Sequence, residues 1–151
     1  MCHIVVIGAG QGGSSLVAKL RKDGFDGEIT LVGAEAALPY QRPPLSKAYL
    51  LGDMALERLF LRPEKFYADN DITLKLGQAV TAIDAEAKTV RVGDEVMRYD
   101  HLALTTGSAP RRLPAGIGGD LVGGCAVLRV VGGCAACPAV ADRPRACGVG
   151  S

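Results

Sequence analysis

The chain has 151 residues, 48% of them hydrophobic, which is enough for one domain with a hydrophobic core but too few for two complete domains. Lys and Arg total 17 against 16 Asp and Glu, so no strong field is available to hold nucleic acid or an anionic membrane. No apolar run approaches the ~18 residues of a membrane span and no secretory leader is visible, so a cytoplasmic location is expected.

The N-terminal part of the chain has the pattern of a βαβ unit. The β-branched run at 4–7 predicts a strand that is buried on both faces. Apolar residues then recur at helical spacing over 11–22, which predicts a helix. A second apolar run at 28–33 predicts the second strand.

Shorter elements are expected after this unit. Prolines make 39–44 an extended loop, and short helices are predicted over 45–51 and 63–70. From Ile72 the apolar period changes to two, which predicts the start of an antiparallel meander.

The meander is expected to contain a hairpin, because 89–92 and 96–99 flank the turn dipeptide Gly93-Asp94. The apolar run at 101–105 predicts a further strand. The predicted fold class is therefore α/β: a Rossmann-like βαβ unit with a parallel sheet, plus a small antiparallel β-meander.

A glycine-rich segment, GAGQGG, joins the first predicted strand to the first predicted helix. Gly8, Gly10 and Gly13 match the pattern G-x-G-x-x-G, whose glycines permit a tight turn, close approach of a pyrophosphate and close helix packing. Gln11 and Gly12 complete the candidate cofactor-binding residues of this loop. The helix N-terminus would stabilise the phosphate charge, and a glycine-rich turn without a ligand is the alternative.

An acidic residue that binds ribose hydroxyls is expected ~20 or more residues after the glycines, at the end of the second strand. Glu35 is the candidate, and a solvated surface glutamate is the alternative. These features leave the dinucleotide open, because they are common to FAD and NAD sites. A plain NAD-binding Rossmann domain therefore remains one possible function.

Two further segments narrow the choice of dinucleotide. LPYQRPPLSK at 38–47 strongly resembles the LPYxRPPLSK signature of the ferredoxin reductase and apoptosis-inducing factor group of FAD-dependent pyridine nucleotide oxidoreductases. DHLALTTGSAPR at 100–111 resembles the YDxLxxATGSxPR stretch of the same group. The resemblance spans residues 3–123 in the expected order, and it implies an FAD-binding fold with FAD as the cofactor.

The resemblance also implies roles for single residues. Arg42 and Lys47 would lie near the flavin and the pyrophosphate, and Lys47 is the candidate catalytic residue, since a positive charge near flavin N5 stabilises the reduced ring. Val80 would offer backbone contacts to the adenine, while Thr106 and Gly107 would close over the dinucleotide. Core packing for Val80 and plain surface exposure for Lys47 are the alternatives.

Two differences from related sequences bear on the chemistry. The group places its ribose-binding acid directly after the residue equivalent to Gly33, where this chain has Ala34 followed by Glu35. Either Glu35 compensates or ribose binding is weakened. Disulfide reductases of the wider superfamily carry a C-x4-C pair where this chain has 42–47 without cysteine. Electrons are therefore expected to pass from the flavin directly to an iron-sulfur protein.

The end of the chain does not continue the pattern of the group. A second glycine-rich unit for NAD(P)H would follow, whereas 125–151 holds four of the five cysteines and no Lys, Glu or aromatic residue. We expect an incomplete FAD-binding domain over 1–124 and an irregular tail over 125–151, produced by a shifted reading frame or a truncation. Cys134 and Cys137 form a C-x2-C pair without the second half of a zinc site, so no metal site is predicted.

Two functions follow from the resemblance. The first is the N-terminal, FAD-binding part of an NAD(P)H-dependent reductase that passes electrons through FAD to an iron-sulfur partner, ferredoxin or rubredoxin. The second is an FAD-binding fragment without turnover, in which nothing delivers hydride. FAD is bound in both, whereas NAD(P)H is a substrate only in the first.

Overall fold

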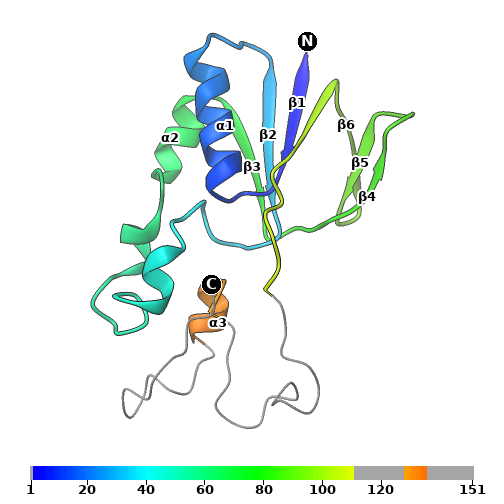
Figure 1. Ribbon diagram of the computed structural model, residues 1–151. Helices are drawn as coiled ribbons and strands as arrows, with labels where there is room; N and C mark the ends of the chain where they lie inside the picture. Colours follow the sequence, from blue (N-terminus) through cyan, green and yellow to red (C-terminus); the bar gives the residue numbers. More distant parts are fainter. Residues whose placement is uncertain (1, 111–127, 136–151) are drawn as a thin grey trace, which may run out of the picture. The chain divides into compact units, whose positions relative to one another are not determined.

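The computed structural model describes residues 2–110 and 128–135. The chain divides into two compact units, and both sheets belong to the first (Figure 1). The first unit consists of Met1–Gln41 and Phe60–Gly107. The second unit consists of Arg42–Leu59 and Ser108–Ser151.

A four-stranded parallel sheet lies at the centre of the first unit, in the order β3-β2-β1-β7. Its strands are β1 (His3–Ile7), β2 (Glu28–Gly33), β3 (Ile72–Leu76) and β7 (His101–Leu104). β1 pairs with β2 on one side and with β7 on the other. The strand order therefore reverses at β1, and open α/β sheets bind ligands beside such a switch point, outside the carboxyl ends of the strands.

Two helices cover one face of the parallel sheet (Figure 1). They are α1 (Gln11–Lys22), which follows β1, and α2 (Glu64–Asp69), which precedes β3. Strands and helices contribute buried side chains to a common core: Val6, Val17, Ile29, Leu31, Tyr67 and Ile72. Basic residues occupy the last turn of α1, where they stabilise the carboxyl end of the helix dipole.

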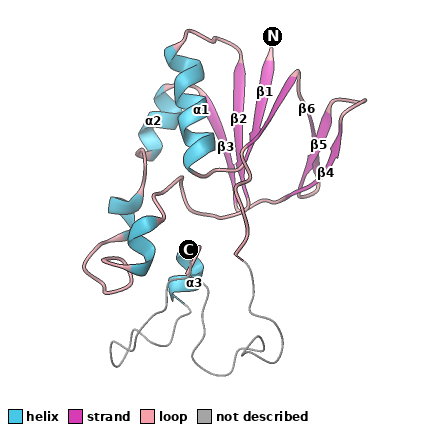
Figure 2. Cartoon of the chain, viewed as in Figure 1, coloured by secondary structure: helices cyan, strands magenta, loops and turns pink. Residues whose placement is uncertain are grey.

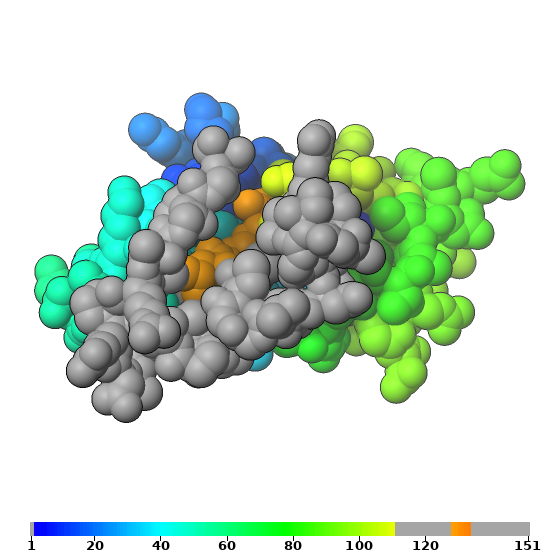
Figure 3. Space-filling model, turned by 60° about the horizontal axis from the view of Figure 1, so that its bottom comes forward, coloured from blue at the N-terminus to red at the C-terminus, as the bar shows by residue number. Residues whose placement is uncertain are grey.

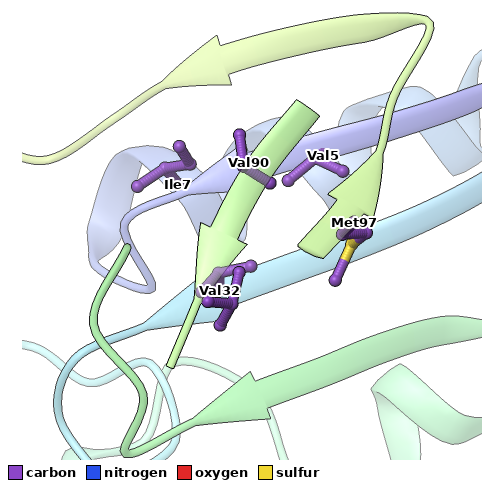
Figure 4. Close-up of a cluster of buried hydrophobic side chains, with 6 residues drawn as sticks. Val5, Ile7, Val32, Val90 and Met97 are labelled. Carbon is purple, nitrogen blue, oxygen red and sulfur yellow. The ribbon is translucent and has the colours of Figure 1, made fainter. Parts of the chain in front are cut away.

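A three-stranded antiparallel sheet, in the order β4-β5-β6, covers the opposite face of the parallel sheet. Its strands are β4 (Val80–Asp84), β5 (Thr89–Val92) and β6 (Glu95–Arg98). Val90 and Met97 pack against Val5, Ile7 and Val32 of the parallel sheet (Figure 4). The outer side of this small sheet faces solvent, and its green to yellow-green residues stand at the surface in Figure 3.

The described part of the second unit consists of short helical segments joined by loops (Figure 2). These are the 3-10 helices η1 (Pro43–Ser46) and η2 (Leu56–Leu59) and the helix α3 (Val131–Ala135), which contacts η1. Arg42 donates a hydrogen bond to the carbonyl oxygen of Arg129, whose guanidinium group donates one to Ser108 Oγ at 3.0 Å. The helix α3 lies in the segment for which the sequence predicted no regular structure.

The structure confirms the α/β fold class and the predicted βαβ unit, hairpin and final strand. The helix predicted over 45–51 is wrong, because a 3-10 turn over Pro43–Ser46 takes its place. Lys47 ends this turn with φ −130° and ψ −117°, outside the helical region. Within the described residues no helix is long and apolar enough to cross a membrane.

The antiparallel meander begins later in the chain than the sequence predicts. Residues 72–76 form β3, the edge strand of the parallel sheet. An edge strand that is covered on one face shows the same apolar period of two as an antiparallel strand, so the pattern cannot separate them. The sequence does not predict β4, because most of its residues are exposed and give little apolar signal.

Candidate dinucleotide site

The glycine-rich loop lies between β1 and α1, at the switch point of the parallel sheet. Gly8 has a φ of 111°, which residues with a side chain rarely adopt. A Cβ at this position would also lie 2.2 Å from the carbonyl oxygen of Thr105. A Cβ at Gly13 would lie 2.1 Å from the carbonyl oxygen of Gly8. The fold itself therefore requires glycine at both positions.

Gly10 differs from these two glycines because the fold does not require it. Its φ of −97° is open to any residue. A Cβ at this position would meet no described protein atom within 4 Å. The space beside Gly10 is therefore open, as the close approach of a ligand to the backbone would require. This is the fit that a bound pyrophosphate needs.

The N-terminus of α1 offers backbone donors to this space. The amides at the start of an α-helix have no acceptor within the helix, and here they belong to 10–13. Gln11 and Gly12 are exposed. The first turn of α1 carries no acidic side chain, and Gly10 provides no side-chain cap. The positive end of the helix dipole is thus suited to a bound anion.

Glu35 follows β2 at the same edge of the sheet, and its side chain is half-buried. The Tyr40 hydroxyl donates a hydrogen bond to its carboxylate. The backbone amide of Gly77 donates to the Glu35 carbonyl oxygen at 2.9 Å. The carboxylate is therefore oriented by a neighbour, while Ala34 is exposed and carries no acceptor side chain. Binding of ribose by Glu35 stays a prediction.

The end of β7 also contacts the glycine-rich loop, through a residue that the sequence does not single out. The Thr105 amide donates to the Ile7 carbonyl oxygen at 2.8 Å, and Thr105 Oγ1 lies 2.9 Å from the Gly8 carbonyl oxygen. Thr106 and Gly107 follow and are exposed. Their predicted closure over a dinucleotide stays a prediction. The position of Thr105 next to the TG pair was the signal that could have found it.

The structure supports a packing role for Val80. The residue begins β4, is half-buried and packs against the cluster that contains Val5 and Ile7. Its backbone pairs with Val92 of β5. The packing role was the alternative reading of this residue, and the adenine contact stays a prediction.

Arg42 and Lys47 belong to the second unit, whereas the other predicted site residues belong to the first. Lys47 is exposed at the end of η1. Arg42 is half-buried and holds the backbone of Arg129 by a hydrogen bond. The roles of Arg42 and Lys47 beside a flavin stay predictions.

A buried polar network joins α1 to α2, and the sequence gives no signal for it. Ser14 Oγ lies 3.0 Å from the Tyr67 hydroxyl and accepts a hydrogen bond from Arg62 at 3.2 Å. Burial raises the pKa of Tyr67, and the hydrogen bond with Ser14 and the charge of Arg62 lower it only partly. The network fixes the first turns of α1, which carry the glycine-rich loop.

Within 2–110 and 128–135, no group of three or more His, Cys, Asp or Glu side chains is arranged to hold a metal ion. Cys137, the second residue of the C-x2-C pair, lies outside the described residues.

Comparison with known proteins places these features in a family. The family model "Pyridine nucleotide-disulphide oxidoreductase" matches residues 2–150. Rhodocoxin reductase of Rhodococcus erythropolis is 48% identical over 130 residues, which cover 85% of this chain and 30% of the relative. Rubredoxin-NAD(+) reductase of Pseudomonas putida is 42% identical over 123 residues, which cover 81% of this chain and 32% of the relative.

Solved structures give the same result. The reductase in a covalent putidaredoxin reductase-putidaredoxin complex matches with a TM-score of 0.80 at 37% identity, over 89% of this chain and 33% of that chain. The chain thus spans about a third of the length of these proteins. Members of this group use FAD, with NAD(P)H as substrate. The chain belongs to the pyridine nucleotide-disulphide oxidoreductase family, in its ferredoxin reductase group.

Proposed function

We propose that this chain binds FAD at the glycine-rich loop and forms the FAD-binding part of a reductase that carries electrons from NAD(P)H to an iron-sulfur protein. The observation that carries the proposal is the open space at Gly10, beside the N-terminus of α1. Neither backbone conformation nor packing requires glycine there. A ligand phosphate that approaches the backbone does require it.

Residues of this chain would contact the pyrophosphate, the ribose hydroxyls and the flavin ring. The amides of 10–13 would hold the pyrophosphate, and the Glu35 carboxylate would accept hydrogen bonds from ribose hydroxyls. Arg42 and Lys47 would supply positive charge to the pyrophosphate and to the reduced ring. When bound, FAD supplies the hydride-accepting and single-electron-donating chemistry.

An iron-sulfur protein is the partner that this proposal assigns. The names of the relatives support it, since they include a rubredoxin-NAD(+) reductase and a reductase solved in complex with putidaredoxin. The segment 42–47 holds no cysteine for a dithiol relay, so direct transfer from the flavin is the remaining route. A cytoplasmic location is part of the same proposal.

A chain that holds FAD but does not turn over by itself is the second candidate. The segment 125–151 contains no second glycine-rich unit of the pattern at Gly8, which favours this candidate. We place the end of the FAD-binding domain near residue 124 on the cysteine-rich composition that follows. The family match runs on to residue 150, so this boundary rests on composition alone.

Two measurements separate the candidates. Purified chain is first titrated with FAD and with NADH, and both candidates predict saturable binding of FAD. Steady-state reduction of an artificial acceptor by NADH is then measured with the FAD-loaded chain. Turnover supports the complete reductase step, and FAD binding without turnover supports the second candidate. Binding of NADH alone would instead indicate a plain NAD-binding Rossmann domain and contradict the proposal.

A further inference from the structure

Thr105 lies beside three of the four glycines of the loop, although it is far from them in the sequence. Its Oγ1 lies 2.9 Å from the Gly8 carbonyl oxygen. A Cβ at Gly12 would lie 3.6 Å from Thr105 Cβ, and a Cβ at Gly13 would lie 3.0 Å from Thr105 Oγ1. Only Gly10 is left open. The side chain of Thr105 therefore lies beside Gly8, Gly12 and Gly13 and leaves the space beside Gly10 open.

The hydroxyl of Thr105 restrains the first peptide of the loop. Its single proton has two acceptors within reach, the Gly8 carbonyl oxygen and the Ile7 carbonyl oxygen at 3.1 Å. The Ile7 oxygen also accepts the Thr105 amide at 2.8 Å. The Gly8 oxygen also lies close to Gly13, where a Cβ would be 2.1 Å from it. The peptide after Gly8 is thus held between β7 and the first turn of α1.

We propose that Thr105 is a positioning residue for the dinucleotide: its hydroxyl fixes the peptide after Gly8, so that the amides of 10–13 are already oriented before the pyrophosphate binds. A loop that is ordered in advance loses less entropy on binding. This inference rests on the proposed function. The YDxLxxATGSxPR stretch that this segment resembles has alanine where this chain has Thr105.

The test uses the full chain and three variants. Thr105→Ala removes the hydroxyl, and Thr105→Ser keeps it. Thr73→Ala removes the hydroxyl of an exposed threonine on β3, which is the other edge strand of the sheet. Binding of FAD and ADP is measured by titration. Amide hydrogen exchange of 8–13 and the melting temperature are measured without ligand.

Thr105→Ala is expected to weaken FAD binding by about fivefold, the effect of one neutral hydrogen bond. The affinity of this variant for ADP should fall by a similar factor, because ADP carries the same diphosphate. The loop amides of this variant should exchange faster than those of the wild type. Thr105→Ser and Thr73→Ala should match the wild type in FAD affinity and in loop exchange.

Three results would overturn the role of Thr105. The first is amide exchange of 8–13 in Thr105→Ala that equals that of the wild type, and the second is a loss of FAD affinity in Thr105→Ser as large as in Thr105→Ala. The third is a lower melting temperature of Thr105→Ala with unchanged FAD affinity. The last result assigns the hydroxyl to folding alone. A wild-type chain that binds no FAD would overturn the proposed function. Amide exchange of 8–13 is measured without ligand, so it tests the role of Thr105 in the loop separately from the proposal that the chain binds FAD.

Discussion

The hydroxyl groups of Ser14 and Tyr67 lie 3.0 Å apart and join α1 to α2 through a buried hydrogen bond. Ser14 is fully buried and Tyr67 is nearly so. Arg62 donates to the same Ser14 oxygen and its guanidinium group lies 5.0 Å from the Phe66 ring centre. The packing of the helix that carries the glycine-rich loop thus depends on a polar contact as well as on the apolar core.

Tyr67→Phe is expected to lower the free energy of unfolding by about 1 kcal/mol, since it removes one buried hydrogen bond while Arg62 still satisfies Ser14. Chemical denaturation of both proteins measures this difference. Tyr49→Phe, in the second unit, is the matched control. Equal stability of Tyr67→Phe and wild type would show that the hydrogen bond contributes nothing net.

The raised pKa of Tyr67 also predicts a pH dependence. The unfolded chain releases this proton near pH 10, and the folded chain releases it at higher pH. The contribution of Tyr67 is therefore complete below about pH 10 and is lost as pH rises toward the folded pKa. The stability difference between wild type and Tyr67→Phe should shrink in this range. A difference that grows with pH would contradict the assignment.

Gly8 and Gly10 differ in environment, so replacing each by alanine should affect stability differently. Gly8→Ala is expected to destabilise the chain by about 3 kcal/mol or more, because φ of 111° and the carbonyl of Thr105 both oppose a Cβ. Gly10→Ala should change stability by only about 0.5 kcal/mol, since its Cβ enters open space. Thermal unfolding of both variants decides this, and equal destabilisation would contradict it.

The contact between the two sheets should be required for the stability of the first unit. Val90 is fully buried in the cluster with Val5 and Ile7, and Val90→Ala is expected to cost about 2 kcal/mol. Val96 lies on the adjacent strand with 54% of its surface exposed, so Val96→Ala should cost about 0.5 kcal/mol or less. Denaturation midpoints of the two variants give the comparison. Equal costs would show that the small sheet does not pack as described.

Glu35→Gln is expected to weaken FAD binding by about tenfold, because a charged acceptor for ribose hydroxyls is replaced by a neutral one. Glu86→Gln, an exposed change in the β4–β5 turn, serves as the control. FAD titration measures both. If Glu35→Gln binds FAD as well as Glu86→Gln does, then Glu35 does not compensate for Ala34 and ribose is held by other groups.

Features that neighbouring residues define were predictable from the sequence. The apolar run of β1, the glycines of the loop and the turn at Gly93-Asp94 each carry their signal within a few positions. The contacts that were missed join distant parts of the chain. Thr105 and Gly8 are 97 positions apart, and Ser14 and Tyr67 are 53 apart. The periodicity of apolar residues within a segment cannot predict such contacts, because they form only when the whole chain has folded.

In the candidate site too, some features were predictable from local sequence and others were not. The sequence predicts that the loop follows the first strand and Glu35 the second, and these two strands are neighbours in the sheet. The sequence assigned β3 to the antiparallel sheet, which is wrong. Because β3 is an edge strand that is buried on one face, its apolar residues alternate with a period of two, as they do in an antiparallel strand. The roles of Arg42 and Lys47 came from resemblance to a family and not from any pattern of charge. They stay predictions that only ligand binding can test.

The central claim is that a dinucleotide phosphate occupies the open space beside Gly10, and one comparison tests it most directly. Wild type and Gly10→Ala are titrated with FAD under conditions in which both are shown to be folded. We predict saturable binding by the wild type, and a loss of affinity of about tenfold or more in Gly10→Ala, because its Cβ takes the place of the phosphate. Equal FAD affinity of the two proteins would contradict the claim.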